Sequence, residues 1–312
     1  MDNYKYKVSV RLMCYNQEKF IRAAMDSIFM QKVDFPVEVV VGDDFSGDET
    51  LNIIRGYKDT EFITVRVLER KVGDEYWKAR KERGRLFNYL DILRNCNGKY
   101  IALLDGDDYW TDELKLKKQV DFLERNPGYS IVSHEAHTSK FNVKNSYNGF
   151  VSILLNNYRF GNIKNALRVL KLYFFDKELF WNSRVTHSKS KRINPYTFRD
   201  ILEYKHFMAT SSIMFRAGVV GKIGDWYTES HEGHYFIVLI ALCCGKGYHF
   251  NRFMSFHRLH EGSVSQDQQR LARVRPRRQQ SKVHRLGCLL EVARPEDRGL
   301  VEKQLNELSV KV

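Results

Sequence analysis

The chain has 312 residues, 43% hydrophobic and 13% aromatic, so it can bury a core and is not a disordered protein. Its formal net charge of +13 indicates an anionic partner, such as a phosphorylated substrate, nucleic acid or an anionic membrane face. Five cysteines without a CxxC pair argue against a disulfide framework and for reduced thiols in the cytoplasm.

No apolar signal-peptide segment is visible at the N-terminus. The longest apolar run, residues 235–244, has about half of the ~20 residues that a membrane-spanning helix needs, so we interpret it as a core helix. We therefore expect a protein that is cytoplasmic and either soluble or peripheral on the inner face of the membrane.

Expected strands and helices alternate over the first 105 residues. Strands are expected over 7–16, 37–41, 62–68 and 99–104, and helices over 18–30, 50–57 and 80–95. The segment VEVVV (37–41) is apolar at all positions but one, which is typical of a parallel strand buried on both faces. The pattern predicts an open α/β sheet, which binds ligands beyond the carboxyl ends of its strands.

The pattern is less regular after residue 105. We expect a helix over 115–127, strands over 129–134 and 209–216, a helix over 235–244, a turn-rich segment over 254–266 and a helix over 300–310. Residues 140–205 are aromatic and basic and are interpreted as a helical insertion. The expected parts are residues 1–135, residues 136–268 with that insertion, and a basic helical tail (269–312).

Polar segments follow three of the expected strands, namely CYN (14–16), GDDFSGDE (42–49) and DGDDYW (105–110). Because parallel strands end at one edge of a sheet, we expect these segments to meet. Asp105, Asp107 and Asp108 would repel one another unless a cation lies among them, and Mg²⁺ or Mn²⁺ binds carboxylate and phosphate oxygens together. The acidic cluster and the positive net charge of the chain together predict a site for a diphosphate ligand that is bound through a divalent metal ion. The alternative is that the acids only cap helices and line solvated turns.

Three segments in this order, KVSVRLMCYNQEKFIRAAMDSIFMQ, VEVVVGDDFSGDET and GKYIALLDGDDYWTDELKLKKQVDFLERNP, resemble the nucleotide-binding half of a family 2 glycosyltransferase. The resemblance is strongest to the bacterial surface-polysaccharide branch, and it covers residues 6–135 densely and 207–265 more loosely. It implies the GT-A fold, a Rossmann-like open mixed sheet flanked by helices, in which residues 1–135 are the nucleotide-sugar-binding half and residues 136–268 the acceptor-binding half. It also implies a hexosyl- or N-acetylhexosaminyl-transferase, inverting and metal-dependent, that makes capsule, O-antigen or exopolysaccharide from a UDP-sugar.

The resemblance also implies roles for residues on the donor side. Cys14, Tyr15 and Asn16 would line the nucleoside pocket, and Asp44 would accept a hydrogen bond from the uracil ring. Asp105-Gly106-Asp107 would be the DxD motif, in which Asp105 contacts the ribose and both acids hold Mn²⁺ or Mg²⁺, with Asp108 assisting through a water. Asn88 would lie near the nucleotide, although residues 73–85 depart from the family pattern.

The sequence leaves two candidates for the general base. In the family it is an acid at the start of a helix, before a Gly-containing turn, and here that place reads ESHEGHYFIVLIALCCGKG, with Gly233-His234 in the place of Gly-Asp. Glu232 is one candidate, and His234, whose imidazole is a competent base near neutral pH, is another. The third reading is a protein that has lost its base and is weak or inactive.

Two further segments extend the resemblance. In FHRLHEGSVS (256–265), Arg258 and His260 match the aromatic-Arg-x-His segment of the family and would meet the diphosphate or the metal, whereas packing or an exposed loop is the alternative. Thr210, Ser211 and Ser212 resemble the strand that flanks the acceptor cleft, where we expect structural roles.

The C-terminal region from 270 to 285 has seven basic residues and no acid. Such a run is usually a solvated face, but it could dock the enzyme at an anionic bilayer near a lipid-linked acceptor, with apolar side chains in the interface. The apolar candidates are Leu271, Val274, Val283 and Leu286. A nucleic-acid-binding protein is the last alternative, and we do not expect that partner because it leaves the acidic strand ends unexplained. The oligomeric state is unknown.

Overall fold

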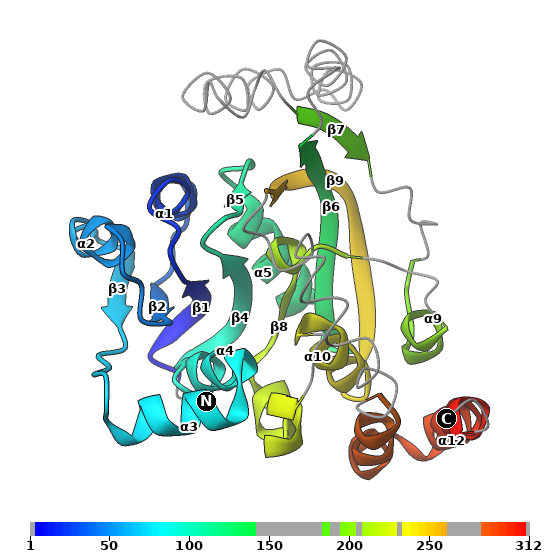
Figure 1. Cartoon of the computed structure of the whole chain (residues 1–312). Helices are drawn as coiled ribbons and strands as arrows, with labels where there is room; N and C mark the ends of the chain where they lie inside the picture. The colour runs from blue at the N-terminus through cyan, green and yellow to red at the C-terminus, as the bar shows by residue number, and fades with distance from the viewer. Residues whose placement is uncertain are drawn as a thin grey trace.

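The computed structural model describes residues 4–141, 183–187, 194–203, 208–229, 233–260 and 282–309. These residues form one mixed nine-stranded sheet with helices on both faces (Figure 1). Eight strands follow the order β3-β2-β1-β4-β8-β6-β9-β5, and β7 pairs with β6. The described strands are β1 (Tyr6–Cys14), β2 (Val37–Asp43), β3 (Ile63–Val67), β4 (Gly98–Asp105), β5 (Tyr109–Trp110), β6 (Tyr129–Phe141), β7 (Ser183–His187), β8 (Met214–Arg216) and β9 (Lys246–Leu259).

The helices cover the two faces of this sheet. The described α-helices are α1 (Ile21–Phe29), α2 (Thr50–Arg55), α3 (Glu75–Arg83), α4 (Arg85–Arg94), α5 (Lys115–Arg125), α9 (Phe198–Leu202), α10 (Gly233–Leu242) and α12 (Pro295–Ser309). Residues 282–292 are also helical. Three short 3-10 helices are η1 (Thr210–Ser212), η2 (Ala217–Lys222) and η3 (Asp225–Glu229).

Alternation along β4 produces a separate apolar core on each face. Tyr100, Ala102 and Leu104 pack with α1 and α5, whereas Ile101 and Leu103 pack with α4 and α10. Successive strand side chains point to opposite faces, so a strand buried on both sides is apolar at most of its positions. The predicted buried strands and the predicted core helix over 235–244 are therefore confirmed.

The sheet is parallel from β3 to β4 and mixed beyond it. β1 pairs in parallel with β2 and β4, whereas β4 pairs antiparallel with β8. β6 and β9 run in parallel, and the short β5 pairs antiparallel with the end of β9 at Phe256 and Ser255. Because β5 follows β4 after a turn, this pairing brings the end of β9 to the acidic segment. The expected boundary at residue 135 falls inside β6, so both halves share the sheet.

Three expected elements differ in the structure. The helix expected over 80–95 is two helices, because Gly84 adopts a positive φ of 80° between α3 and α4. The strand expected over 209–216 is η1 followed by the short β8. The turn-rich interpretation of 254–266 is wrong up to Leu259, where β9 ends. Polar side chains that are buried in β9, such as Ser255 and Arg258, conceal the strand pattern.

The helix over residues 282–292 packs on α10, and α12 packs on α9. Arg285 is buried with its guanidinium 4.6 Å from the ring of Phe236, and Leu286 is buried in the same core. The expectation that Leu286 faces a membrane is therefore wrong, because its side chain is covered by the protein. Residues 270–281, with most of the basic run, lie outside the described residues. Across the described ranges, none of the helices combines the length and the apolar composition needed to span a membrane.

Candidate donor and acceptor sites

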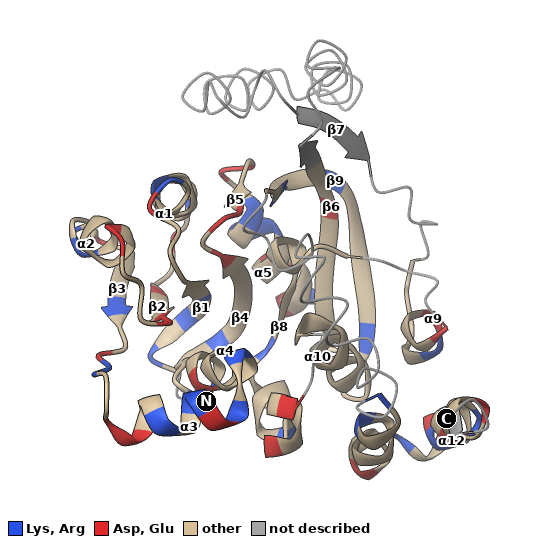
Figure 2. Ribbon diagram, viewed as in Figure 1, with Lys and Arg blue, Asp and Glu red and all other residues tan. Residues whose placement is uncertain are grey.

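The carboxyl ends of β1, β2 and β4 lie side by side. In the two parallel ladders Met13 pairs with Asp105, and Cys14 pairs with Asp43. The three polar segments therefore meet at one edge of the sheet, as predicted. Figure 2 shows acidic residues at this end of β4.

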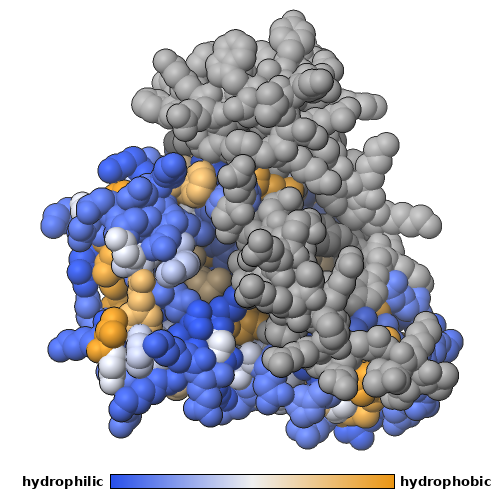
Figure 3. All heavy atoms as spheres, viewed as in Figure 1, coloured by the Kyte–Doolittle hydropathy of each residue, from blue (hydrophilic) through white to orange (hydrophobic). Residues whose placement is uncertain are grey.

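Asn16 joins the loops that follow β1 and β2. Its side-chain oxygen accepts a hydrogen bond from the Gly47 N–H at 2.8 Å, and its own N–H donates to Ser46 Oγ at 2.9 Å. The neighbouring Tyr15 is 56% exposed, and Asn16 is exposed as well. Cys14 is buried, with its thiol 3.5 Å from Asp43 Oδ1. Tyr15 and Asn16 are therefore open to solvent, whereas Cys14 is not. The described part of the face drawn in Figure 3 is mainly hydrophilic.

Asp44 forms an ion pair that the sequence did not predict. Both of its carboxylate oxygens accept hydrogen bonds from Arg80 of α3, and both side chains are largely buried. α3 is strongly charged and has no buried residue, so apolar periodicity gave no sign that it reaches the site. The charge of Asp44 is balanced within the protein, and a nucleobase at Asp44 would also meet Arg80.

Asn88 lies behind the β2 loop and is fully buried. Its amide nitrogen donates to the Gly42 carbonyl at 3.0 Å, and its amide oxygen accepts from Arg70 Nη1 at 2.6 Å. Arg70 also donates to the backbone carbonyl of Asp43 at 3.1 Å. Asn88 therefore supports the loop that carries Asp44 and is not open to solvent at the edge of the sheet.

Asp105 is paired with a buried arginine from the neighbouring strand. Arg11 Nη1 lies 2.7 Å from Asp105 Oδ1, and the guanidinium stacks at 4.0 Å from the centre of the Tyr89 ring. Arg11 is completely buried, whereas the Asp105 side chain is 26% exposed. Sequence reasoning missed Arg11, although a charged residue between Val10 and Leu12 in a buried strand was a visible signal.

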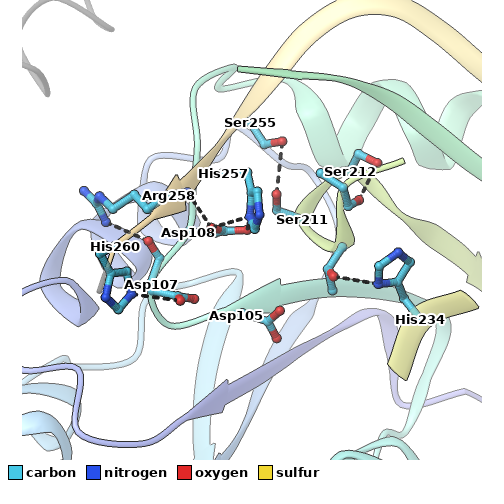
Figure 4. Close-up of polar contacts among 12 residues, drawn as sticks. Asp105, Asp107, Asp108, Ser211, Ser212, His234, Ser255, His257, Arg258 and His260 are labelled. Carbon is cyan, nitrogen blue, oxygen red and sulfur yellow. Dashed lines mark hydrogen bonds and ion pairs between the residues drawn. The ribbon is translucent and has the colours of Figure 1, made fainter. Parts of the chain in front are cut away.

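Asp107 meets the end of β9. His260 Nε2 lies 3.2 Å from Asp107 Oδ2, and Arg258 Nη1 donates to the Asp107 backbone carbonyl at 3.0 Å (Figure 4). Arg258 is buried, with its guanidinium 4.5 Å from the Tyr109 ring. The side chains of His260 and Asp107 are both partly exposed, whereas Arg258 is buried and supports the turn through its hydrogen bond to the Asp107 carbonyl.

Asp108 holds the imidazole of His257. Its buried carboxylate accepts from His257 Nδ1 at 3.1 Å and from the Arg258 N–H at 3.0 Å. The charge of Asp108, with smaller effects of Asp107 and Asp105 and against the effect of burial, raises the pKa of His257 to about 9. His257 is therefore cationic at neutral pH. In the sequence, His257 stands where the resembling family segment has an aromatic residue, so its pairing with Asp108 was not expected.

The structure places a positive charge of its own beside two of the three acids. Arg11 pairs with Asp105 and His257 with Asp108, and His260 Nε2 lies against Asp107. Repulsion among the acids therefore does not by itself require a metal. Within the described ranges no three His, Cys, Asp or Glu side chains are grouped to hold a metal ion. Asp107 and His260 nevertheless provide one carboxylate and one imidazole, which suit a divalent cation that takes its other ligands from a diphosphate and water.

His234, one of the two candidate bases, is the second residue of α10. Its Nδ1 lies 3.1 Å from Thr210 Oγ1 in η1. The start of α10 is fixed by Tyr227, whose hydroxyl donates to the Gly233 carbonyl at 2.7 Å. Glu232, the other candidate base, lies outside the described residues. The structure therefore places His234 beside η1 and does not locate Glu232.

Comparison with known sequences gives a family match. Residues 9–187 match the sequence model described as glycosyl transferase family 2. An uncharacterized protein of Mycobacterium tuberculosis is 39% identical over 127 residues, which are 41% of this chain and 34% of that protein. The putative teichuronic acid biosynthesis glycosyltransferase TuaG of Bacillus subtilis is 33% identical over 136 residues, which are 43% of this chain and 49% of that protein.

A third relative is from Escherichia coli. The UDP-Glc:alpha-D-GlcNAc-diphosphoundecaprenol beta-1,3-glucosyltransferase WfaP is 31% identical over 117 residues, which are 38% of this chain and 41% of that enzyme. The chain thus spans about a third to a half of the length of these relatives.

Solved structures share the fold. TarS 1-349 of Staphylococcus aureus in complex with UDP-GlcNAc has a TM-score of 0.60 at 17% identity, covering 97% of this chain and 71% of that chain. The mannosyltransferase PcManGT of Pyrobaculum calidifontis in complex with GDP-Man and Mn²⁺ has a TM-score of 0.51 at 17% identity, covering 97% and 70%. At these identities the likeness shows the fold alone.

Proposed function

Because the chain belongs to glycosyl transferase family 2 and has the GT-A fold, we propose that it moves a sugar from a UDP-sugar to a glycan or lipid-linked acceptor in the synthesis of a bacterial surface polysaccharide. The names of the relatives agree with this proposal. WfaP is named for transfer from UDP-Glc to a GlcNAc-diphosphoundecaprenol, TuaG for teichuronic acid biosynthesis, and TarS was solved with UDP-GlcNAc. The transferred sugar is accordingly a hexose or an N-acetylhexosamine.

One observation carries the proposal, namely the meeting of Asp107 and His260. These residues are 153 positions apart, yet their side chains are 3.2 Å from one another where the parallel strands end. The position is the one at which open α/β sheets bind nucleotides. A carboxylate and an imidazole at that position can bind a cation and a diphosphate together.

We propose that Asp107 and His260 hold Mn²⁺ or Mg²⁺ together with the diphosphate of the donor. Asp105 Oδ1 accepts a hydrogen bond from Arg11, so we propose that Asp105 Oδ2 contacts the ribose or the cation. Tyr15 lies against the nucleoside, and Asp44 accepts from the base, as the family resemblance implies. A bound cation stabilises the negative charge on the departing diphosphate.

The acceptor hydroxyl must lose its proton as it attacks the sugar carbon. We propose that His234 receives this proton, because the structure places it at the start of α10 beside η1, and Glu232 is the alternative. A single displacement by the activated hydroxyl inverts the sugar carbon, so we propose an inverting reaction.

We also propose peripheral contact with an anionic membrane. The support is the basic composition of residues 270–282, since Arg285 and Leu286 are buried. Co-sedimentation with vesicles that contain an anionic phospholipid tests this contact, and equal binding to neutral vesicles would contradict it.

The experiment that tests the function uses the purified chain with UDP-glucose or UDP-GlcNAc, MnCl₂ and a bacterial lipid extract. We expect release of UDP together with incorporation of labelled sugar into the lipid fraction. Binding of UDP without release of UDP from either donor, even by slow hydrolysis, would favour a nucleotide-sugar-binding protein without activity. That outcome would contradict the transferase assignment.

A further inference from the structure

The 3-10 helix η1 is fixed by hydrogen bonds from elements of the donor side. Trp110 Nε1 donates to the Ser211 carbonyl at 2.9 Å, and Gln119 Nε2 donates to the Ser212 carbonyl at 2.9 Å. Ser211 Oγ also donates to Ser255 Oγ of β9 at 3.2 Å. Since Ser211 and Ser212 are fully buried, the backbone of η1 has little freedom.

η1 also lies next to the end of β4. The residue that follows it, Ile213, accepts a hydrogen bond from the Leu103 N–H at 3.0 Å, two positions before Asp105. In Figure 4 Asp105 is drawn between the Asp107–His260 pair and His234. Thr210, the first residue of η1, therefore belongs to a rigid segment that lies between the acidic turn and α10.

Thr210 contacts Nδ1 of His234, which is one of the two ring nitrogens that can carry the proton of the neutral imidazole. Its Oγ1 is 3.1 Å from Nδ1, within hydrogen-bonding distance. A histidine that accepts a proton on Nε2 must carry its neutral-state proton on Nδ1, and a hydrogen-bond acceptor at Nδ1 favours that tautomer. Carboxylates and carbonyl groups fulfil this function next to many catalytic histidines, and a threonine hydroxyl can accept in the same way.

We propose that Thr210 is a positioning residue that accepts a hydrogen bond from Nδ1–H of His234 and so directs Nε2 to the acceptor hydroxyl, an inference that rests on the proposed transferase function with His234 as base. As the hydroxyl attacks, its oxygen forms a bond to the sugar carbon and its proton passes to Nε2. The bond from that carbon to the diphosphate oxygen breaks, and its electron pair leaves with the nucleoside diphosphate. The imidazolium that results keeps its Nδ1–H on Thr210.

The test uses the full chain labelled with ¹⁵N-histidine, in which the His234 resonances are assigned by comparison with His234→Gln. In the unaltered protein and in Thr210→Ser we expect the ¹⁵N shifts of the Nδ1–H tautomer. Thr210→Val, which has nearly the same shape but no hydroxyl, is expected to shift His234 towards the Nε2–H tautomer. An Nε2–H tautomer in the unaltered protein would overturn the proposal.

Kinetics under the transferase assay supply the second readout. Thr210→Val is expected to lower kcat by about tenfold with the KM for the UDP-sugar unchanged, as is usual when a partner of a catalytic group is lost, and Thr210→Ser is expected to restore it. Thr228→Val, which removes a hydroxyl bonded to the Asp225 carbonyl in η3, is the matched control and should change neither readout.

Two kinetic outcomes would overturn the inference while leaving the transferase assignment intact. One is an unchanged kcat in Thr210→Val, and the other is an equal loss in the Val and Ser variants, which indicates a structural role. If the unaltered chain does not turn over any donor, the proposed function fails instead. The tautomer measured by NMR then still decides whether Thr210 orients His234.

Discussion

Arg11 and Asp105 form an ion pair of 2.7 Å between adjacent parallel strands, with the arginine completely buried and the aspartate at the surface. The pair places a positive charge beneath the first acid of the DGDD segment before any ligand binds. His257 places a second positive charge against Asp108, and His260 Nε2 lies against Asp107, so each of the three acids has a partner within the protein. The acidic turn is therefore organised by the protein and offers its remaining oxygens to a ligand.

Arg11→Met tests this charge balance, because it removes the positive charge and keeps most of the volume. We expect Mn²⁺ alone to bind several-fold more tightly, since Asp105 becomes available to it, and UDP alone to bind about tenfold more weakly, since repulsion of the diphosphate increases. Isothermal titration calorimetry measures both. Arg55→Met, which breaks an exposed pair with Glu69, is the control and should change neither affinity. Unchanged binding in Arg11→Met would show that the pair is only structural.

Gly106→Ala tests how closely the acidic turn packs on the segment after β1. A Cβ at Gly106 would lie 2.4 Å from Gln17 Oε1, 2.9 Å from Ile21 Cδ1 and 3.0 Å from Cys14 Cβ, so either these side chains or the turn must shift. We expect UDP affinity with Mn²⁺ to fall by about tenfold, because Asp105 and Asp107 are displaced together.

Gly47→Ala is the matched control in the adjacent loop, since a Cβ there meets nothing within 4 Å. It should bind UDP like the unaltered chain. Equal affinities in the two variants would contradict the close packing of the DGDD turn.

The His257–Asp108 pair predicts a specific dependence of stability on pH. The pKa of His257 is about 9 in the folded chain, above its usual value of 6.5, so the pair contributes fully below about pH 6.5. This contribution is lost as the pH rises through 9. We expect the free energy of unfolding in urea to fall by about 2 kcal/mol between pH 6.5 and 9.5, with part of the shift discounted for solvent exposure.

His257→Gln should lack most of that fall, whereas His284→Gln, which alters an exposed histidine paired with Glu229, should retain it. A pH profile that is the same in His257→Gln and in the unaltered chain would show that another group causes the loss.

Much of the fold was predictable because it depends on apolar periodicity. The apolar segments around Val39 and Leu103 predicted buried parallel strands, and the polar residues after them predicted where the strand ends meet. β9 was missed because Ser255 and Arg258 are buried polar residues, so its sequence resembles that of a turn. The helix expected over residues 80–95 is interrupted at Gly84 because this residue has a positive φ. The spacing of apolar residues does not indicate such a backbone angle.

The candidate site was predictable where a motif is local and not where partners come from distant segments. The acids of the DGDD segment were evident from the sequence. Arg11 and Arg80, their neighbours in space, come from a strand and from an exposed charged helix, and only the folded chain brings them to the site. Thr210 illustrates the same limit, because its significance depends on a contact with His234, 24 positions away.

The central claim is that Asp107 and His260 bind a divalent cation together with the donor diphosphate. Titration of UDP with and without Mn²⁺ into the unaltered chain, Asp107→Asn and Asp34→Asn tests it most directly, the last being a control in an exposed pair with Lys117. We expect Mn²⁺ to strengthen UDP binding at least tenfold in the unaltered chain and in Asp34→Asn, and to have almost no effect in Asp107→Asn. Undiminished enhancement by Mn²⁺ in Asp107→Asn would contradict the claim.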